Sequence, residues 1–92
     1  MKKYNVYELF DGEVGNVMNE NEFNKKFGKF NGGEDICDIE SFDFENSEIY
    51  LCKVDGYRGE GCYDGIVVKD GKSYFLDIVS EGVVCELEFF NW

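Results

Sequence analysis

The stretch GIVVKDGKSYFLDIV, residues 65–79, decides the fold, because it carries two apolar runs on either side of a tight-turn dipeptide. Asp70-Gly71 is typical of a two-residue hairpin loop, since Asp and Gly tolerate the positive φ angles that such a turn requires. The flanking runs are rich in Val, Ile, Tyr and Phe, which favour strands. The stretch therefore predicts a β-hairpin.

The turn also sets the register of this hairpin. Counting outward from Asp70-Gly71 places Val67 opposite Tyr74 and Ile66 opposite Phe75. Successive residues of a strand point to opposite faces, so both faces of the hairpin are apolar. A strand that is apolar on both faces belongs in the middle of a sheet that is covered on both sides.

A further strand is predicted over residues 83–90. Its odd-numbered residues are Val, Cys, Leu and Phe, and they alternate with Val, Glu, Glu and Phe at the even-numbered positions. The short loop that precedes it would place Ile78 opposite Val83 and Leu76 opposite Cys85. The last strand is therefore expected to pair with the second strand of the hairpin.

Two more strands are predicted upstream, over residues 35–45 and 48–54, with Asn46-Ser47 as the turn between them. This turn would place Glu45 directly opposite Glu48. Like charges that face each other across two strands cost up to about 1 kcal/mol of stability. The sequence thus predicts a local electrostatic cost in this hairpin.

The apolar residues of the same segment indicate one buried face. Phe42 and Phe44 are expected to lie with Ile49 and Leu51 on the side of the core. Upstream of Ser41 the apolar residues change from even to odd positions. This change of phase predicts a β-bulge or a break near Ser41.

The N-terminal part is predicted to hold a strand over residues 3–10, closed by Asp11-Gly12, and then a helix. Asn19 and Glu22 have the spacing of a capping box at the start of this helix. Residues 31–33 are expected to end it, because they are Asn-Gly-Gly. Three aromatic residues at helical spacing form its apolar face: Phe23, Phe27 and Phe30.

The predicted order is β-α-β-β-β-β-β, which is an α+β fold. We expect a mainly antiparallel sheet of about five to six strands with one helix packed on one face. The chain, residues 1–92, is expected to form a single domain. It has no run of apolar residues long enough to cross a membrane and no signal-peptide pattern, so we expect a cytoplasmic protein.

The negative charge is concentrated in the second part of the chain. Residues 1–33 contain five acidic and five basic residues, whereas residues 34–92 contain fifteen acidic and four basic residues, so the net charge of −11 arises after residue 33. Residues 34–48 contain seven acidic residues and no basic residue. Such a surface repels nucleic acids and anionic membranes and attracts basic proteins.

Catalytic groups are scarce. The chain contains no histidine, which excludes Ser-His-Asp and Cys-His pairs. The four cysteines are widely spaced, at Cys37, Cys52, Cys62 and Cys85, and the chain has no CxxC pair, so a zinc site is not expected. We expect four reduced thiols and a protein that is not an enzyme.

Neither a metal nor a cofactor is expected. The acidic segment lacks the order of ligands found in an EF-hand loop, and strand alternation would send its carboxylates to opposite faces. The loop of residues 55–65 contains four glycines but no Gly-Lys-Ser/Thr motif, and its Glu60 and Asp64 would repel phosphate. A long hairpin loop is the simplest interpretation. Tyr57, Arg58 and Tyr63 in this loop also suit a protein interface.

The function hypothesis is that the acidic segment binds a basic partner. Carboxylates without local counter-ions would stand in for the phosphates of a nucleic acid, as in a DNA mimic, or complement a groove lined with Lys and Arg. The chain lacks Pro, Ala, His, Thr and Gln, a bias that is typical of AT-rich coding sequences of low-GC bacteria and their phages. The predicted partner-binding residues are Glu34, Asp35, Asp38, Glu40, Asp43, Glu45, Glu48, Tyr50, Tyr57, Arg58 and Tyr63.

Three functions are considered. The first two depend on binding to a basic partner, and the third does not. The first is a phage inhibitor of a bacterial defence system, of the anti-CRISPR or anti-restriction type, that occupies a basic nucleic-acid-binding surface. The second is an immunity protein or antitoxin that neutralises a basic nuclease toxin. The third is a small housekeeping interaction module, either monomeric or a homodimer held by Phe89-Phe90-Asn91-Trp92.

Overall fold

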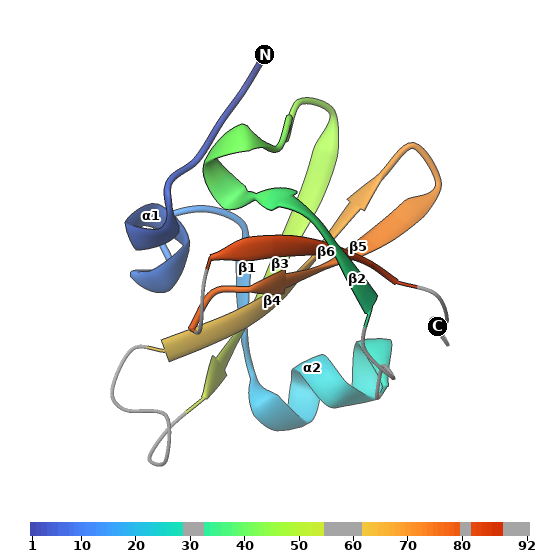
Figure 1. The fold of residues 1–92 in the computed structure, drawn as a ribbon. Helices are drawn as coiled ribbons and strands as arrows, with labels where there is room; N and C mark the ends of the chain where they lie inside the picture. The colour runs from blue at the N-terminus through green and yellow to red at the C-terminus, as the bar shows by residue number, and fades with distance from the viewer. Residues whose placement is uncertain (29–32, 55–61, 80–81, 88–92) are drawn as a thin grey trace.

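The computed structural model describes residues 1–28, 33–54, 62–79 and 82–87 (Figure 1). Two short helices, a 3₁₀ turn (η1) and one six-stranded sheet make up this part of the chain. The predicted α+β fold with a mainly antiparallel sheet is confirmed. The elements are α1 (Val6–Phe10), β1 (Asn16–Asn19), α2 (Glu20–Phe27), β2 (Gly33–Asp38), η1 (Ile39–Ser41), β3 (Ser47–Val54), β4 (Cys62–Lys69), β5 (Lys72–Asp77) and β6 (Val83–Leu87).

The strands lie in the order β1-β3-β4-β5-β6-β2. Only β1 and β3 are parallel, and the other four pairs are antiparallel. β4 and β5 therefore lie in the middle of the sheet, as the apolar hairpin predicts, and β1 and β2 form its two edges. None of the helices in the described ranges is long and apolar enough to span a membrane.

The hairpin of β4 and β5 has the predicted register. Val67 pairs with Tyr74, and Ile66 pairs with Phe75. Asp70 and Gly71 form the turn with φ angles of 52° and 77°. Positive φ at both central residues is the requirement of a type I′ turn, whose twist matches that of the strands.

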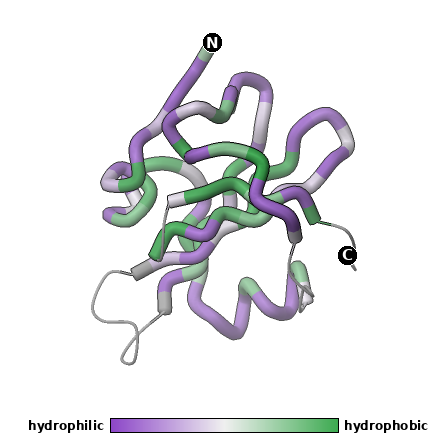
Figure 2. Tube along the Cα trace, in the orientation of Figure 1, coloured by the Kyte–Doolittle hydropathy of each residue, from purple (hydrophilic) through white to green (hydrophobic). Residues whose placement is uncertain are grey.

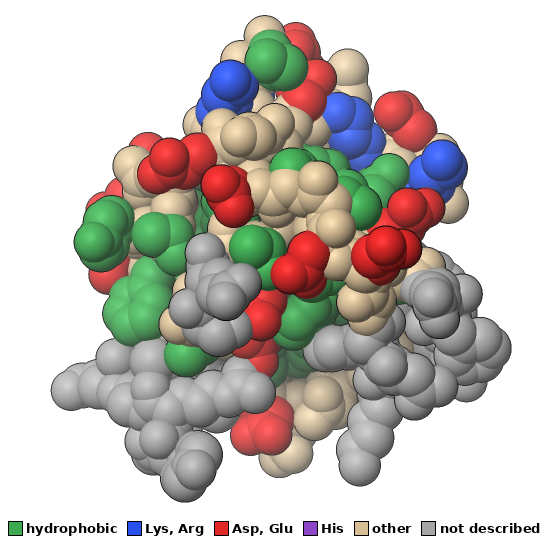
Figure 3. All heavy atoms as spheres, viewed as in Figure 1, with side chains coloured by type: hydrophobic (Ala, Val, Ile, Leu, Met, Phe, Trp, Pro, Cys, Tyr) green, Lys and Arg blue, Asp and Glu red, His purple; other side chains and the backbone are tan. Residues whose placement is uncertain are grey.

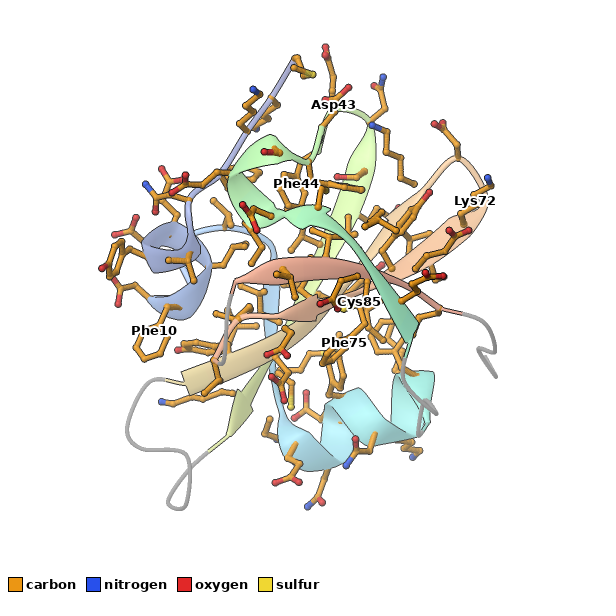
Figure 4. The ribbon with its side chains drawn as sticks, viewed as in Figure 1. Phe10, Asp43, Phe44, Lys72, Phe75 and Cys85 are labelled. Carbon is orange, nitrogen blue, oxygen red and sulfur yellow. The ribbon has the colours of Figure 1, made fainter. Side chains whose placement is uncertain are left out.

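Each face of the sheet carries its own hydrophobic core (Figures 1 and 2). α2 covers one face, where Phe23 and Phe27 pack on Cys52 and Ile66. The opposite, larger core is closed by α1 and by the segment around η1, which contribute these buried side chains: Leu9, Ile39, Phe42 and Phe44. In Figure 4, Phe44 lies on the α1 side of the sheet, and Phe75 and Cys85 lie on the α2 side.

The predicted helix is confirmed at its start and is shorter than predicted at its end. The Asn19 side chain accepts a hydrogen bond from the backbone N–H of Glu22 at 2.9 Å, which satisfies a free donor of the first turn. The helix ends at Phe27 and Gly28, where φ is 71°. Phe30, the third aromatic of the predicted stripe, lies outside the described residues.

The predicted strand over residues 3–10 is wrong, because the structure has α1 there. Asn5 caps α1: its side chain accepts from the Glu8 N–H at 3.0 Å, and the Glu8 carboxylate accepts from the Asn5 N–H at 2.9 Å. These two bonds satisfy two donors that a strand would have placed in a ladder.

The predicted hairpin of residues 35–45 and 48–54 is also wrong. β2 pairs with β6, and the chain then leaves the sheet through η1 and a turn at Asn46, where φ is 60°. The predicted break near Ser41 is confirmed by η1, and a bulge interrupts β2 between Asp35 and Cys37. The predicted core residues of this segment are all buried: Phe42, Phe44, Ile49 and Leu51.

Two further differences concern pairing. β6 is shifted by one residue from the predicted register, because Leu76 pairs with Val84 rather than with Cys85. β1 was not predicted; it pairs with β3 from Asn16 opposite Tyr50 to Asn19 opposite Lys53. Parallel pairing between distant segments has no local turn signal in the sequence.

Candidate acidic interface

The candidate site is the edge of the sheet formed by β2 and its surroundings. We call it the acidic edge, and it consists of five exposed carboxylates from β2, η1 and β6: Glu34, Asp35, Asp38, Glu40 and Glu86. Among the described residues none of the five forms an ion pair. The acidic edge is therefore a surface of negative charge that the described cations do not neutralise.

Strand pairing places these carboxylates on both faces of the sheet. Tyr74, Glu86 and Glu34 form one row across β5, β6 and β2, on the face of the larger core. Phe75, Cys85 and Asp35 form the next row, on the face that α2 covers. Successive rows alternate between the two faces.

Glu34 and Glu86 lie directly opposite each other in adjacent strands. Two like charges in this arrangement destabilise the sheet by a few tenths of a kcal/mol to about 1 kcal/mol. The sequence predicts such a pair at Glu45 and Glu48, but the structure has it here, between two strands that lie far apart in the chain.

The lysines that are visible in Figure 3 lie away from the region of β2 and β6. There they gather at the end of the molecule that holds the N-terminus and the β4–β5 turn, whereas carboxylates extend down across the region of β2 and β6. On the face seen in Figure 3, carboxylates predominate over the region of β2 and β6, which favours approach by a basic partner.

The other predicted carboxylates have partners of their own. Lys69 Nζ lies 3.4 Å from Asp43 Oδ2, and the amino group of Met1 lies 3.5 Å from Glu45 Oε2. The Glu45 N–H donates to Asp43 at 3.0 Å, and this bond, followed by the effect of Lys69, holds the pKa of Asp43 below its usual value. The prediction that this segment has no local counter-ions is therefore wrong for Asp43 and Glu45.

The two described tyrosines of the predicted interface, Tyr50 and Tyr63, also have partners within the protein. The Tyr50 hydroxyl donates to Glu48, which raises the pKa of Tyr50, and its ring packs 5.0 Å from the ring of Phe27 beneath α2. Tyr63 is only 8% exposed and belongs to the larger core. Tyr57 and Arg58 lie outside the described residues.

A cysteine of β6, Cys85, contacts the acidic edge. Cys85 Sγ donates to Asp35 Oδ1 at 3.0 Å. Burial, followed by this hydrogen bond and by the charges of Asp35 and Asp77, raises the pKa of Cys85 to about 12. Burial and the charge of Asp38 likewise raise the pKa of Cys37. Protonated thiols are poor nucleophiles, so a raised pKa lowers the reactivity of both cysteines.

We expect the wild type to lose more stability in alkali than the Cys85→Val variant. The folded state holds the Cys85 proton up to about pH 12, whereas an unfolded thiol loses it near pH 8.5. Below pH 8.5 the contribution is complete, and above it the free energy of unfolding falls by at most about 1.4 kcal/mol per pH unit. Urea unfolding of both proteins between about pH 8 and pH 11 measures the difference, and parallel pH profiles would contradict it.

The described residues contain no group of three or more His, Cys, Asp or Glu side chains placed to hold a metal ion. A depression of about 240 Å³ beside the acidic edge is lined by Val6, Asp38, Ile39, Glu40 and Gly82. It is smaller than typical ligand sites.

No protein-family model, curated protein or solved structure matches this chain. The geometry of the acidic edge is therefore the basis for the proposed function.

Proposed function

We propose that this protein binds a basic protein surface through the acidic edge and inhibits a nucleic-acid-handling protein in this way. The partner class that suits this chemistry best is a nuclease of a bacterial defence system, so the protein would act as a phage anti-CRISPR or anti-restriction inhibitor. Its carboxylates would occupy the channel in which the partner binds nucleic-acid phosphates.

The observation that carries this proposal is the pairing of Glu34 with Glu86. The fold keeps two exposed carboxylates opposite each other at a cost in stability, and neither has an ion pair among the described residues. A single Lys at either position would replace repulsion by attraction. Local cost without local compensation is typical of residues retained for binding.

Direct binding to purified basic nucleases tests the proposal. The panel contains CRISPR effector nucleases, restriction endonucleases and nuclease toxins, with an acidic nuclease as the control. We expect at least one basic nuclease to bind and lose activity, and its association rate to fall about tenfold or more between 50 mM and 500 mM salt.

The outcomes separate the candidate roles. Inhibition of a nuclease toxin alone would assign the role of an immunity protein. If no basic nuclease binds at 50 mM salt, or if association is insensitive to salt, the proposal is wrong. The acidic control should not bind at either salt concentration.

A further inference from the structure

Among the residues that the structure describes, the outer side of β2 is an open strand edge. β2 is the last strand of the sheet in the described ranges, where its one pairing partner is β6. Within the described residues no backbone hydrogen bond reaches its outer side, and the bond from the Ile39 N–H to the Gly82 carbonyl, at 2.7 Å, continues the pairing with β6 on its inner side. About half of the N–H and C=O groups of an edge strand point outward and are available to another chain.

Side chains on this edge are negative on both faces of the sheet. Glu34 lies on the face of the larger core, in the row of Tyr74 and Glu86, and Asp35 and Asp38 lie on the opposite face. An added strand would alternate its own side chains between the same two faces. Neighbouring basic residues in that strand would each meet a carboxylate, whereas an acidic strand would be repelled on both faces.

The middle of β2 offers one apolar contact. Ile36 lies at the bulge and is 45% exposed. An extended partner with an apolar residue between basic ones would cover this side chain. The bulge also limits the length of regular pairing, because it disturbs the ladder locally.

A second copy of this chain does not fit this edge. Two β2 strands placed side by side would bring Glu34, Asp35 and Asp38 of each copy together, and each chain carries a net charge of −11. The opposite edge differs, since β1 consists of Asn16, Val17, Met18 and Asn19 and carries no charge. The charge on β2 thus excludes self-pairing and selects a basic occupant.

We infer that β2 binds an extended segment rich in Arg and Lys as an added strand of the sheet. This inference rests on the proposed function and names the chemistry of the partner that the acidic edge takes. Backbone hydrogen bonds to β2 supply the geometry, and the carboxylates on the two faces select the charge.

N-methylated peptides test the inference. The probe is the capped peptide RKVRKV, which is as long as β2, together with two forms that are N-methylated at alternate residues, one at the odd and one at the even positions. All three peptides carry the same charge. In an added strand only alternate N–H groups face β2, so one methylated form is expected to bind about tenfold or more weaker and the other within about threefold of the unmodified peptide.

Amide hydrogen exchange of the full chain gives a second readout. The unmodified peptide is expected to slow exchange at alternate residues of β2 and to leave β1 unchanged. Equal binding of all three peptides without protection of β2 would overturn strand addition and leave the proposed function standing as a contact between charged surfaces. Absence of peptide binding at about 50 mM salt would also overturn strand addition, and the nuclease panel would then decide the proposed function separately.

Discussion

Gly15→Ala is expected to lower the free energy of unfolding by about 2–5 kcal/mol, whereas Gly71→Ala lowers it by only about 1–2 kcal/mol. Both glycines have a φ of 77°, so alanine meets the same backbone strain at each position. The surroundings differ. A Cβ on Gly15 would lie 2.6 Å from the Ile49 carbonyl oxygen, whereas a Cβ on Gly71 would have no atom within 4 Å.

The clash at Gly15 cannot be relieved by a change of rotamer, because the nearest atom belongs to the backbone of β3. Gly15 directly precedes β1, so the chain must move away from β3 and weaken their parallel pairing. A folded chain of 92 residues has a total stability of roughly 5–14 kcal/mol, which makes this loss severe. Urea unfolding of both variants measures the effect, and equal losses would show that the close approach to Ile49 is absent in solution.

Reversing two charges of the acidic edge, by Glu34→Lys with Asp38→Lys, is expected to weaken binding to the basic partner by on the order of a hundredfold or more. Close charge pairs across interfaces couple by about 1.5 kcal/mol or more each, and 1.4 kcal/mol corresponds to a factor of ten. Both side chains are exposed, and Asp38 makes no capping bond to η1, so neither contributes a contact that the fold needs.

The same variant is expected to keep or slightly raise its stability. Glu34→Lys places an ammonium group opposite Glu86 and replaces the repulsion within the pair by attraction, a gain of up to about 1 kcal/mol. Asp11→Lys with Glu13→Lys is the matched control, because it also changes the net charge from −11 to −7 (−11 + 4) on the connection between α1 and β1.

Isothermal titration of both variants against the partner of the wild type separates a local surface from general acidity. The control should bind within about threefold of the wild type. If both variants lose affinity equally, net charge alone attracts the partner, and the acidic edge is not the binding site.

Local patterns in the sequence predicted the elements that local interactions build. The Asp70-Gly71 turn set the register of β4 and β5, and the Asn19 cap marked the start of α2. The same capping-box spacing is present at Asn5 and Glu8, but the Tyr, Val, Leu and Phe residues that precede Asp11-Gly12 favoured a strand over residues 3–10. The capping bonds at Asn5 and Glu8 outweighed this strand propensity.

The features that the sequence did not predict depend on pairing between strands that are distant in the chain. The sequence predicted the carboxylates of residues 34–48 as one surface, but three strands of the sheet separate β2 from β3. Glu86 was not predicted as part of the site, because its neighbour Glu34 lies far away in the chain. No turn or spacing in the sequence indicates that β2 and β6 are adjacent.

The pairing of β2 with β6 has a consequence for synthesis of the protein on the ribosome. The strand that starts at Gly33 has no partner until the strand that ends at Leu87 has been translated and has left the exit tunnel. A nascent chain that stops before Val83 therefore leaves both sides of β2 unpaired, and the carboxylates of β2 disfavour premature pairing with other acidic nascent chains.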